Sequence, residues 1–464
     1  MPDNPVSFPS DPQPKLLNEY EKLTSRHYKI LAMSWAGWVF DFYDLILFTF
    51  LLIPISREYN FTNLQMSYVL GASLAATAIG GVVFGILSDR FGRKPVLQMT
   101  ILTYSVGTFL SGLAGSFWLL MVFRILTGLG VGGEWGTGQT YIGETFPAKV
   151  RGRYCAMMQT GAPLGIALAS IVGGMISPVI GWRACFFISL LPAILVLFIR
   201  RHLPESDLWL HRKKIFKSGL ATVREKGSNG LQQFQLLFSK ANRKYFILGL
   251  ILAIFDMSAY WLTYSWMPGY LHTERNFTLT KSAFWILVTQ TGGFLGYLIF
   301  GFVADRLGRR PAYSIYSVIM ALGLVMVTIF WDNIVMYPFI ILFFMFMVGF
   351  GTGMFGGFGS LFSELFPTSI RSTAMGSAFN LARGIQFFTP VIISIIAMKY
   401  GLGGGISLAA VFALLTGAWI WTFPETRGRK LYAGDQLRFS DLSNLSACPP
   451  VQLVFVPLPY IFLP

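Results

Sequence analysis

Six ionisable side chains interrupt stretches of about twenty residues that are otherwise almost entirely apolar. They are Asp41, Asp44, Arg124, Glu134, Asp256 and Arg383. Because a charge exposed to lipid costs about 3 kcal/mol or more, we expect these groups to face a protected interior and to serve an ion or substrate pathway. An arginine stays protonated and presents a planar fork of donors that suits a carboxylate, whereas a carboxyl group in a dry interior can take up and release a proton. The combination suits binding of an organic anion together with a proton.

Some of these charges have two interpretations. Arg124 fits two roles equally well: it neutralises a buried acid nearby, or it takes a direct part in coupling. Arg383 has polar neighbours in Asn380 and Gln386 and has no counterpart in the other half of the chain. We therefore expect Arg383 to bind a ligand rather than to pair within the scaffold. Asp256 fits either role.

Aromatic residues gather near the acids of two apolar stretches. Tyrosine and tryptophan offer an apolar wall and a hydrogen-bond donor, which is useful around a small polar ligand. Trp266 lies near the end of its stretch, where an interfacial position is expected instead. The predicted substrate contacts are Arg383, Arg124, Asn380, Tyr260, Tyr264 and Trp38, and the predicted proton-coupling acids are Asp41, Asp44, Asp256 and Glu134.

The elements that must position these side chains are long apolar helices. The chain has 464 residues, of which 54% are hydrophobic and 12% are charged. A soluble domain carries about 25% charged residues, so the composition indicates a protein embedded in the lipid bilayer. We predict an all-α integral membrane protein with twelve spans, at 29–54, 65–87, 95–114, 117–145, 154–179, 183–203, 245–270, 282–304, 312–331, 335–362, 372–398 and 404–423.

An internal repeat divides the chain into two similar halves. The segment Gly85–Pro95 recurs almost letter for letter as Gly301–Pro311, an offset of 216 residues (85 to 301). A second pair, Glu144–Arg151 and Glu364–Arg371, has an offset of 220 residues (144 to 364). Transporters built from such repeats bind substrate near the middle of the membrane, between the repeats. The predicted segments are a cytoplasmic leader at 1–28, six-helix bundles at 29–203 and 245–428, a cytoplasmic linker at 204–244 and a poorly ordered tail at 429–464.

The repeated loops have a mainly structural interpretation. Their acids lie near basic partners and helix ends, so we expect them to latch the two halves together in one conformational state. The glutamates that follow are expected to belong to the same network at the protein surface. The predicted latch residues are Asp89, Arg93, Asp305, Arg309, Glu144, Arg151, Glu364 and Arg371.

The pattern Gly-x-x-x-Asp-Arg-x-Gly-Arg-Lys/Arg in both loops resembles the loop signature of the major facilitator superfamily. Residues 34–44, 130–147 and 181–187 resemble the sialate:proton symporter subgroup, which includes lactate and other monocarboxylate permeases. This resemblance implies proton-coupled uptake of a small carboxylate such as a lactate-like acid or sialic acid. It also implies that the acids of the first helix and Arg124 and Glu134 of the fourth take part in coupling.

Two other transport classes stay open. Pro424–Gly428 resembles sugar porters, which would mark a sugar or polyol facilitator. A drug:proton antiporter would be expected to carry Gly-Pro-x-x-Gly-Gly in its fifth helix, whereas this chain has the weaker form Gly161–Gly165. The chain lacks a nucleophile with a base, a phosphate loop and metal-ligand spacing, so we expect neither an enzyme nor a cofactor or metal.

The positive charge indicates how the chain lies in the membrane. The formal net charge is +15, and lysine and arginine concentrate before the first span, in the repeated loops, at 200–244 and after the last span. This asymmetry predicts a multi-pass cell-membrane protein with both termini in the cytoplasm, and gives no reason to expect nucleic acid. We expect the chain to act as a monomer, with a small anion, a proton and the bilayer as its partners.

Overall fold

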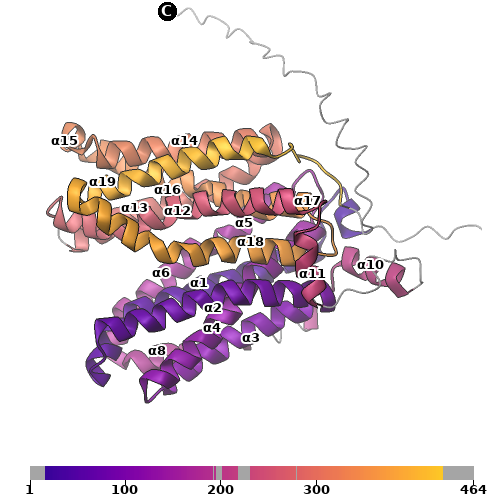
Figure 1. Ribbon diagram of the computed structural model, residues 1–464, viewed down its shortest axis with the longest axis horizontal. Coiled ribbons are helices and arrows are strands. Elements are labelled where there is room, and N and C mark those ends of the chain that lie inside the picture. The colour runs from indigo at the N-terminus through magenta and orange to yellow at the C-terminus, as the bar shows by residue number, and fades with distance from the viewer. Residues whose placement is uncertain (1–15, 192, 195–200, 218–229, 278, 432–464) are drawn as a thin grey trace, which may run out of the picture.

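The structure is a bundle of long helices. This computed structural model describes residues 16–191, 193–194, 201–217, 230–277 and 279–431, and within those ranges the chain forms helices and no strand. Helices from the first half of the chain lie beside helices from the second half, and short helices lie at one end (Figure 1). The prediction of an all-α fold is confirmed.

The first half contains one long helix for each of its first four spans, and the fifth span is broken. Its helices are η1 (Leu17–Glu19), α1 (Ser25–Tyr59), α2 (Asn63–Phe91), α3 (Arg93–Leu113), α4 (Phe117–Thr145), α5 (Arg151–Gln159), α6 (Gly161–Ser170), the π-helical turn η2 (Ile171–Ile176), α7 (Ser177–Ile180) and α8 (Trp182–Ile188). Two short helices of the central segment follow, α10 (Asp207–Lys217) and α11 (Gly230–Leu237).

The second half repeats this plan. Its helices are α12 (Arg243–Thr273), α13 (Leu279–Leu307), α14 (Arg309–Thr328), α15 (Trp331–Ile334), α16 (Pro338–Gly351), η3 (Thr352–Gly356), α17 (Gly357–Leu365), α18 (Arg371–Ile385), η4 (Gln386–Phe388), α19 (Thr389–Trp419) and η5 (Ile420–Thr422).

Ten helical segments within the described ranges are long and apolar enough to cross a membrane. The sixth predicted span includes residues 195–200, which lie outside the described ranges. The eleventh corresponds to α18, η4 and the first part of α19, and Gly401 (φ 71°) turns the chain within α19 before the last span. The helices are consistent with the predicted twelve spans. The segment boundaries stay predictions, and residues 432–464 of the tail lie outside the described ranges.

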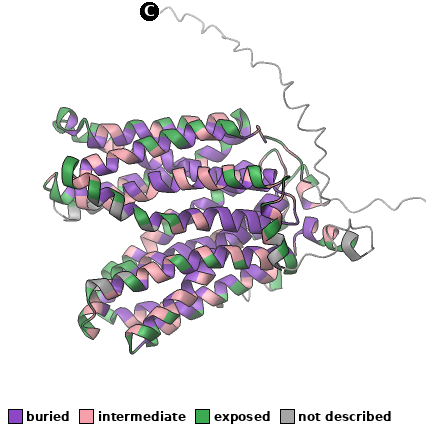
Figure 2. Cartoon of the chain, viewed as in Figure 1, coloured by how far each residue is buried: buried purple, intermediate pink, exposed green. Residues whose placement is uncertain are grey.

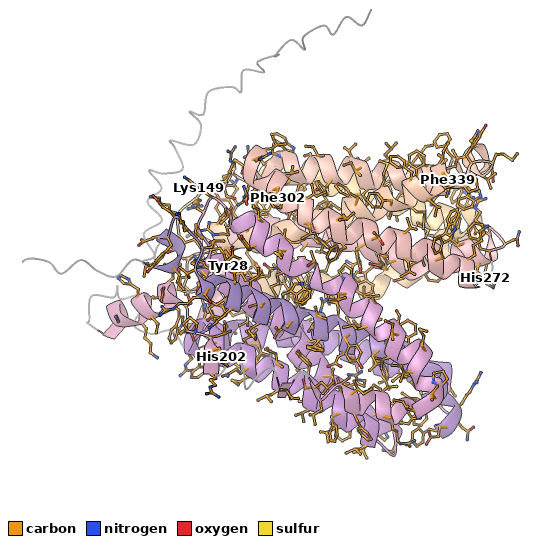
Figure 3. All side chains as sticks on the ribbon, turned by 180° about the vertical axis from the view of Figure 1, so that it is seen from behind. Tyr28, Lys149, His202, His272, Phe302 and Phe339 are labelled. Carbon is orange, nitrogen blue, oxygen red and sulfur yellow. The ribbon has the colours of Figure 1, made fainter. Side chains whose placement is uncertain are left out.

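Burial follows the pattern expected of helices in lipid. Buried residues line the inside of each bundle and the end at which the bundles meet, and exposed residues lie on the outer faces and helix ends (Figure 2). Several exposed side chains are large and apolar: Phe339 is 86% exposed and Phe302 is 50% exposed (Figure 3). In water such a surface would be unfavourable, whereas lipid tails cover it without cost.

The two halves approach most closely at the end that carries the repeated loops, called the basic end below. A Cβ added to Gly136 of α4 would lie 2.8 Å from the Cα of Gly376 in α18, and one added to Gly85 of α2 would lie 2.8 Å from the carbonyl oxygen of Ser372. Any side chain at these glycines would push the halves apart. Away from the basic end, the two bundles diverge (Figure 3).

Candidate functional site

Arg383 lies on α18 where the two halves meet, and aromatic rings surround its guanidinium group. The side chain is 4% exposed, and its central carbon lies 5.9 Å from the ring centroids of Trp38 and Phe42 on α1 and 5.3 Å from that of Phe379. Such cation–π contacts stabilise the charge without using its hydrogen-bond donors. The Nη1 atom has no hydrogen-bond partner among the described residues. Arg383 therefore keeps a donor that a ligand can use.

Asp41 is the acid that acts electrostatically on Arg383. It lies one turn after Trp38 on α1, it is fully buried, and neither carboxyl oxygen has a hydrogen-bond partner among the described residues. The charges of Glu134 and Asp44 also act on it. Asp41 thus experiences the charges of one arginine and two further acids, although within the described ranges it forms no ion pair with Arg383 at 4.0 Å or less.

Glu134 is a second buried acid with an unpartnered oxygen. Thr100 donates a hydrogen bond of 2.7 Å to its Oε2 atom, and Oε1 has no partner among the described residues. A Cβ added to Gly37 of α1 would collide with Oε1, so a glycine is needed where α1 passes this carboxyl group. The acids of α1 and α4 consequently share one interior region.

Arg124 belongs to a separate cluster. Its Nη2 atom donates a hydrogen bond of 3.0 Å to Thr108, and its guanidinium group lies 4.8 Å from the ring of Phe48 and 5.7 Å from that of Phe186. Asp44 is the acid that acts on Arg124, although within the described ranges the two form no ion pair at 4.0 Å or less. The structure thus divides the two arginines between two groups of residues.

The remaining predicted contacts lie in two places. Tyr260 and Tyr264 of α12 are half-buried with ring centroids 4.4 Å apart, and Tyr260 interacts electrostatically with Arg383. The Nδ2 atom of Asn380 donates to the carbonyl oxygens of Gly132 (2.8 Å) and Gly376 (3.0 Å). Its amide hydrogens therefore tie α18 to α4 and are not free for a ligand in this state.

Asp256 lies apart from the arginines. It is fully buried on α12, and neither of its oxygens has a partner among the described residues. Its charge acts on the hydroxyl groups of Tyr297 and Tyr313. Among the described residues, no charged group is found to act on Asp256 in return. Its surroundings differ from those of Asp41, which faces an arginine.

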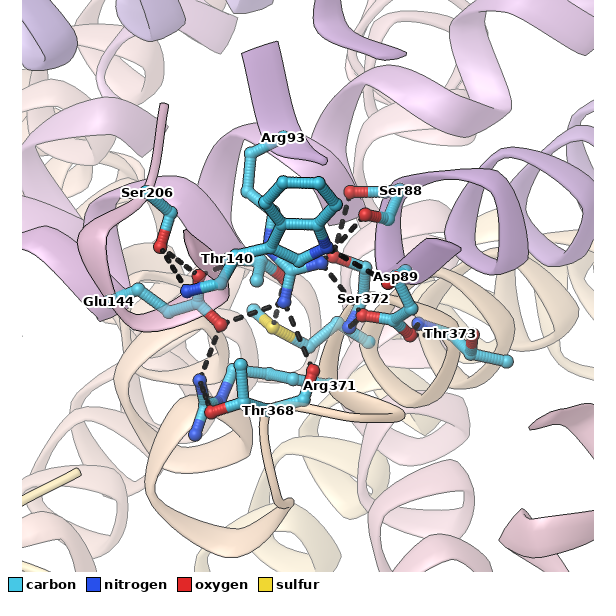
Figure 4. Close-up of polar contacts among 12 residues, drawn as sticks. Ser88, Asp89, Arg93, Thr140, Glu144, Ser206, Thr368, Arg371, Ser372 and Thr373 are labelled. Carbon is cyan, nitrogen blue, oxygen red and sulfur yellow. Dashed lines mark hydrogen bonds and ion pairs between the residues drawn. The ribbon is translucent and has the colours of Figure 1, made fainter. Parts of the chain in front are cut away.

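At the basic end, the acids of the repeated loops bind helix N-termini of the opposite half. Asp89 accepts hydrogen bonds from the backbone N–H groups of Ser372 (3.1 Å) and Thr373 (2.8 Å), at the start of α18, and forms an ion pair with Arg93 at 2.9 Å (Figure 4). A carboxylate at this position satisfies orphan donors and complements the helix dipole.

The second half repeats this arrangement. Asp305 accepts from the backbone N–H groups of Gly152 and Arg153 (both 3.0 Å) at the start of α5, and pairs with Arg309 at 2.8 Å. Each half therefore caps a helix of the other.

Two glutamates link the halves by ion pairs. Glu144 binds Arg93 of its own half (2.7 Å) and Arg371 of the other half (2.5 Å) (Figure 4). Glu364 binds Arg309 of its own half (2.8 Å) and Arg151 of the other half (3.2 Å). The expectation that these residues form a surface network is wrong. Both glutamate side chains are buried, because the helix ends of the two halves converge on them and exclude water.

The sequence analysis missed several residues of these sites. Glu205 and Glu425 cap the N-termini of α3 and α14, since each accepts a hydrogen bond of 2.9 Å from the first backbone N–H of its helix. Their offset of 220 residues (205 to 425) could have indicated paired roles. Nothing in the sequence distinguishes Phe42 and Phe379, beside Arg383, from the other aromatic residues, which make up 16% of the chain.

Two bundles related by a sequence repeat, with buried charges between them, define a membrane transporter of the major facilitator type. Residues 33–385 match the family described as the Major Facilitator Superfamily, and the chain belongs to that family. It is accordingly a multi-pass membrane transporter and not an enzyme.

Several curated proteins are similar over most of their length. A putative metabolite transport protein of Haemophilus influenzae is 32% identical, with 88% of this chain and 99% of the relative covered. The cis,cis-muconate transport protein of Acinetobacter baylyi is 31% identical (85% and 94% covered), and the sialic acid transporter NanX of Escherichia coli is 29% identical (84% and 93% covered). These relatives are named as transporters of small molecules, and two of them are named for organic acids.

A similar solved structure is that of the proton:xylose symporter XylE bound to 6-bromo-6-deoxy-D-glucose. It has a TM-score of 0.72 and 22% sequence identity, with 88% of this chain and 98% of that chain covered. At this identity the likeness shows the fold alone.

Proposed function

We propose that this chain imports a small organic acid anion together with a proton by alternating access. The observation that carries the proposal is the buried guanidinium group of Arg383, which keeps an unpartnered donor where the two halves meet and experiences the charge of the buried carboxyl group of Asp41. Relatives named for transport of muconate and sialic acid support an organic acid as the substrate.

The charges of Arg383 and Asp41 supply the coupling. Without substrate, an ionised Asp41 balances Arg383. A substrate carboxylate that binds Arg383 replaces Asp41 as the counter-ion, and an unpaired carboxylate in a buried site is strongly unfavourable. A proton on Asp41 removes this penalty, so anion and proton bind together. One proton with one monoanion adds no net charge, and transport is then electroneutral.

The other buried acids are assigned to the proton pathway. Glu134 and Asp44 both act on Asp41, so a proton gained by either group changes the charge that Asp41 experiences. Asp256 has unpartnered oxygens in the second half and is assigned the same role. Arg124 balances Asp44 and so tunes the pathway without touching the substrate.

The ion pairs of the basic end serve as the inner gate in this proposal. Asp89 and Asp305 each hold a helix of the opposite half, so the halves cannot separate there without breaking these bonds. The conformation with a closed basic end then takes up substrate from the other side. With the basic end in the cytoplasm of the cell, transport is uptake, and one chain contains every part that the cycle needs.

A thermal-shift screen of the purified protein tests the class of substrate. Lactate, benzoate and sialic acid are compared with xylose and a polyol at equal concentration. The proposal expects at least one carboxylate to raise the melting temperature, and more strongly at acid pH, because the proton binds with it. Stabilisation by the neutral sugars alone would indicate a sugar transporter instead.

A further inference from the structure

Arg383 lies within a set of rings from two helices, α1 and α18. The ring centroids of Trp38 and Phe42 are 4.8 Å apart at an interplanar angle of 77°, and those of Trp38 and Phe379 are 6.5 Å apart at 65°. Each of these rings also lies within 6 Å of the guanidinium carbon. The carboxylate of any ligand on Arg383 must therefore enter between aromatic faces and edges.

The rings continue from Phe379 further into the second half without a break. Phe379 and Phe358 have centroids 6.1 Å apart, Phe358 and Phe355 5.9 Å, and Phe355 and Tyr260 5.4 Å. All lie within the range of 4.5–7 Å in which aromatic pairs attract. Tyr260 is half-buried and interacts electrostatically with Arg383, so this series of rings ends on a side chain that keeps some exposed surface.

Some hydrogen-bonding groups near Arg383 are already used, whereas the Oδ1 atom of Asn380, the Nε1 atom of Trp38 and both oxygens of Asp41 have no partner among the described residues. Both Nδ2 bonds of Asn380 go to backbone carbonyls. The Nε2 atom of Gln386 donates to the backbone of Ala382, and its Oε1 atom accepts from Ser258 and Thr389. Each hydroxyl group of a ligand beyond the few that these atoms can bind would be buried without a partner, which costs affinity. The surroundings of Arg383 therefore disfavour a ligand that carries many hydroxyl groups.

We infer that the substrate is a planar, conjugated monocarboxylate, aromatic or polyene, whose carboxylate binds Arg383 while its π system packs against the rings of Phe42, Phe355 and Tyr260. This inference rests on the proposed function and names the substrate class of that site. A conjugated ligand presents positive edges to the ring faces and gains about two- to twelve-fold in affinity for each well-placed ring contact. A saturated acid of the same size gains the burial of apolar surface alone.

Two matched pairs of ligands test the inference on the full-length protein in detergent or nanodiscs. Benzoate is compared with cyclohexanecarboxylate, and sorbate with hexanoate, by calorimetry at one pH. Each pair shares its charge and carbon skeleton, and the saturated member is the more hydrophobic, so burial of apolar surface alone would favour it. We expect the conjugated member to bind roughly ten-fold more tightly.

The outcomes separate this inference from the proposed function. Equal or tighter binding of the saturated acids, or of sialic acid, overturns the inference and leaves an anion transporter. Failure of every carboxylate to bind overturns the proposed function as well.

Substitutions test which rings cause the tighter binding of conjugated acids. Phe42→Leu should reduce the ratio of benzoate to cyclohexanecarboxylate affinity to about three-fold or less. Phe48→Leu is the matched control, since Phe48 lies on the same helix but over Arg124, and it should leave the ratio unchanged. The half-exposed Tyr260→Leu is the second test and does not depend on the folding of the Phe42 variant. A ratio unchanged in the variants of both Phe42 and Tyr260 refutes the placement of the ligand.

Discussion

The substitution Arg383→Gln tests the anion site most sharply. Glutamine keeps an amide donor and much of the length, but it removes the positive charge and the two-pronged geometry that suits a carboxylate. Because Arg383 is buried between rings and Asp41 is the acid that acts on it, no other described side chain can take its place. The bound anion would then be a buried charge without a partner.

The loss of binding affinity expected for Arg383→Gln can be estimated. Removing one partner of a buried, hydrogen-bonded charge pair costs about 2–5 kcal/mol, which corresponds to roughly 30- to 5,000-fold weaker binding. Arg383→Lys keeps the charge and loses the planar fork, so its affinity should lie between the wild type and Arg383→Gln.

Equilibrium binding of radiolabelled benzoate to the purified variants measures this loss. Arg124→Gln is the matched control, because Arg124 is also buried yet contacts Thr108, Phe48 and Phe186 instead. It should change affinity by about three-fold or less. Wild-type affinity in a folded Arg383→Gln protein, or an equal loss in both variants, would refute the assignment of the anion to Arg383.

Three further predictions follow from the buried groups. Asp41→Asn should keep counterflow exchange of the anion but lose accumulation driven by a pH gradient, because the amide carries no exchangeable charge; accumulation at the wild-type level would exclude Asp41 as the coupling acid. Gly376→Val should open the basic end, since α18 there touches α2 and α4, and a cysteine introduced at that end should react faster than in Gly174→Ala, where a Cβ meets nothing within 4 Å. Burial raises the pKa of Glu205 in the folded protein above its value in the unfolded chain. The neutral carboxyl group therefore contributes its full stabilisation at pH values below the unfolded pKa. This contribution is lost as the pH rises through the folded pKa. The melting temperature of the wild type should therefore fall more steeply than that of Glu205→Gln as the pH rises above about 4, the ordinary pKa of a glutamate, and parallel curves would contradict this.

The sequence was sufficient for the helices and for the pairing of the two halves. Hydropathy over about twenty residues and the repeated loops predict the spans, since each depends on short-range pattern. Which charge meets which could not be predicted, because that depends on how each helix is rotated about its own axis. Glu144 is one example: its partners lie on α3 and at the start of α18, far along the chain.

Asn380 and Arg124 show the same limit. Both are polar residues of predicted spans, and the sequence made both candidates for substrate contact. In the structure Asn380 fastens α18 to α4, because glycines bring these helices into contact, and Arg124 lies among Thr108 and two phenylalanine rings. Only the packing of the helices shows whether such a side chain holds two helices together or is free to bind a ligand.

The most direct measurement of the central claim is uptake into proteoliposomes with an imposed pH gradient. Radiolabelled benzoate is supplied outside at acid pH, with the interior buffered near neutrality and the membrane potential clamped at zero by potassium and valinomycin. The account predicts accumulation above the outside concentration and above the level in protein-free liposomes, through which benzoic acid diffuses unaided. This accumulation should be abolished by collapse of the pH gradient and unchanged when the potassium gradient is altered to impose a potential. Uptake that only equilibrates and ignores the gradient would contradict symport with a proton.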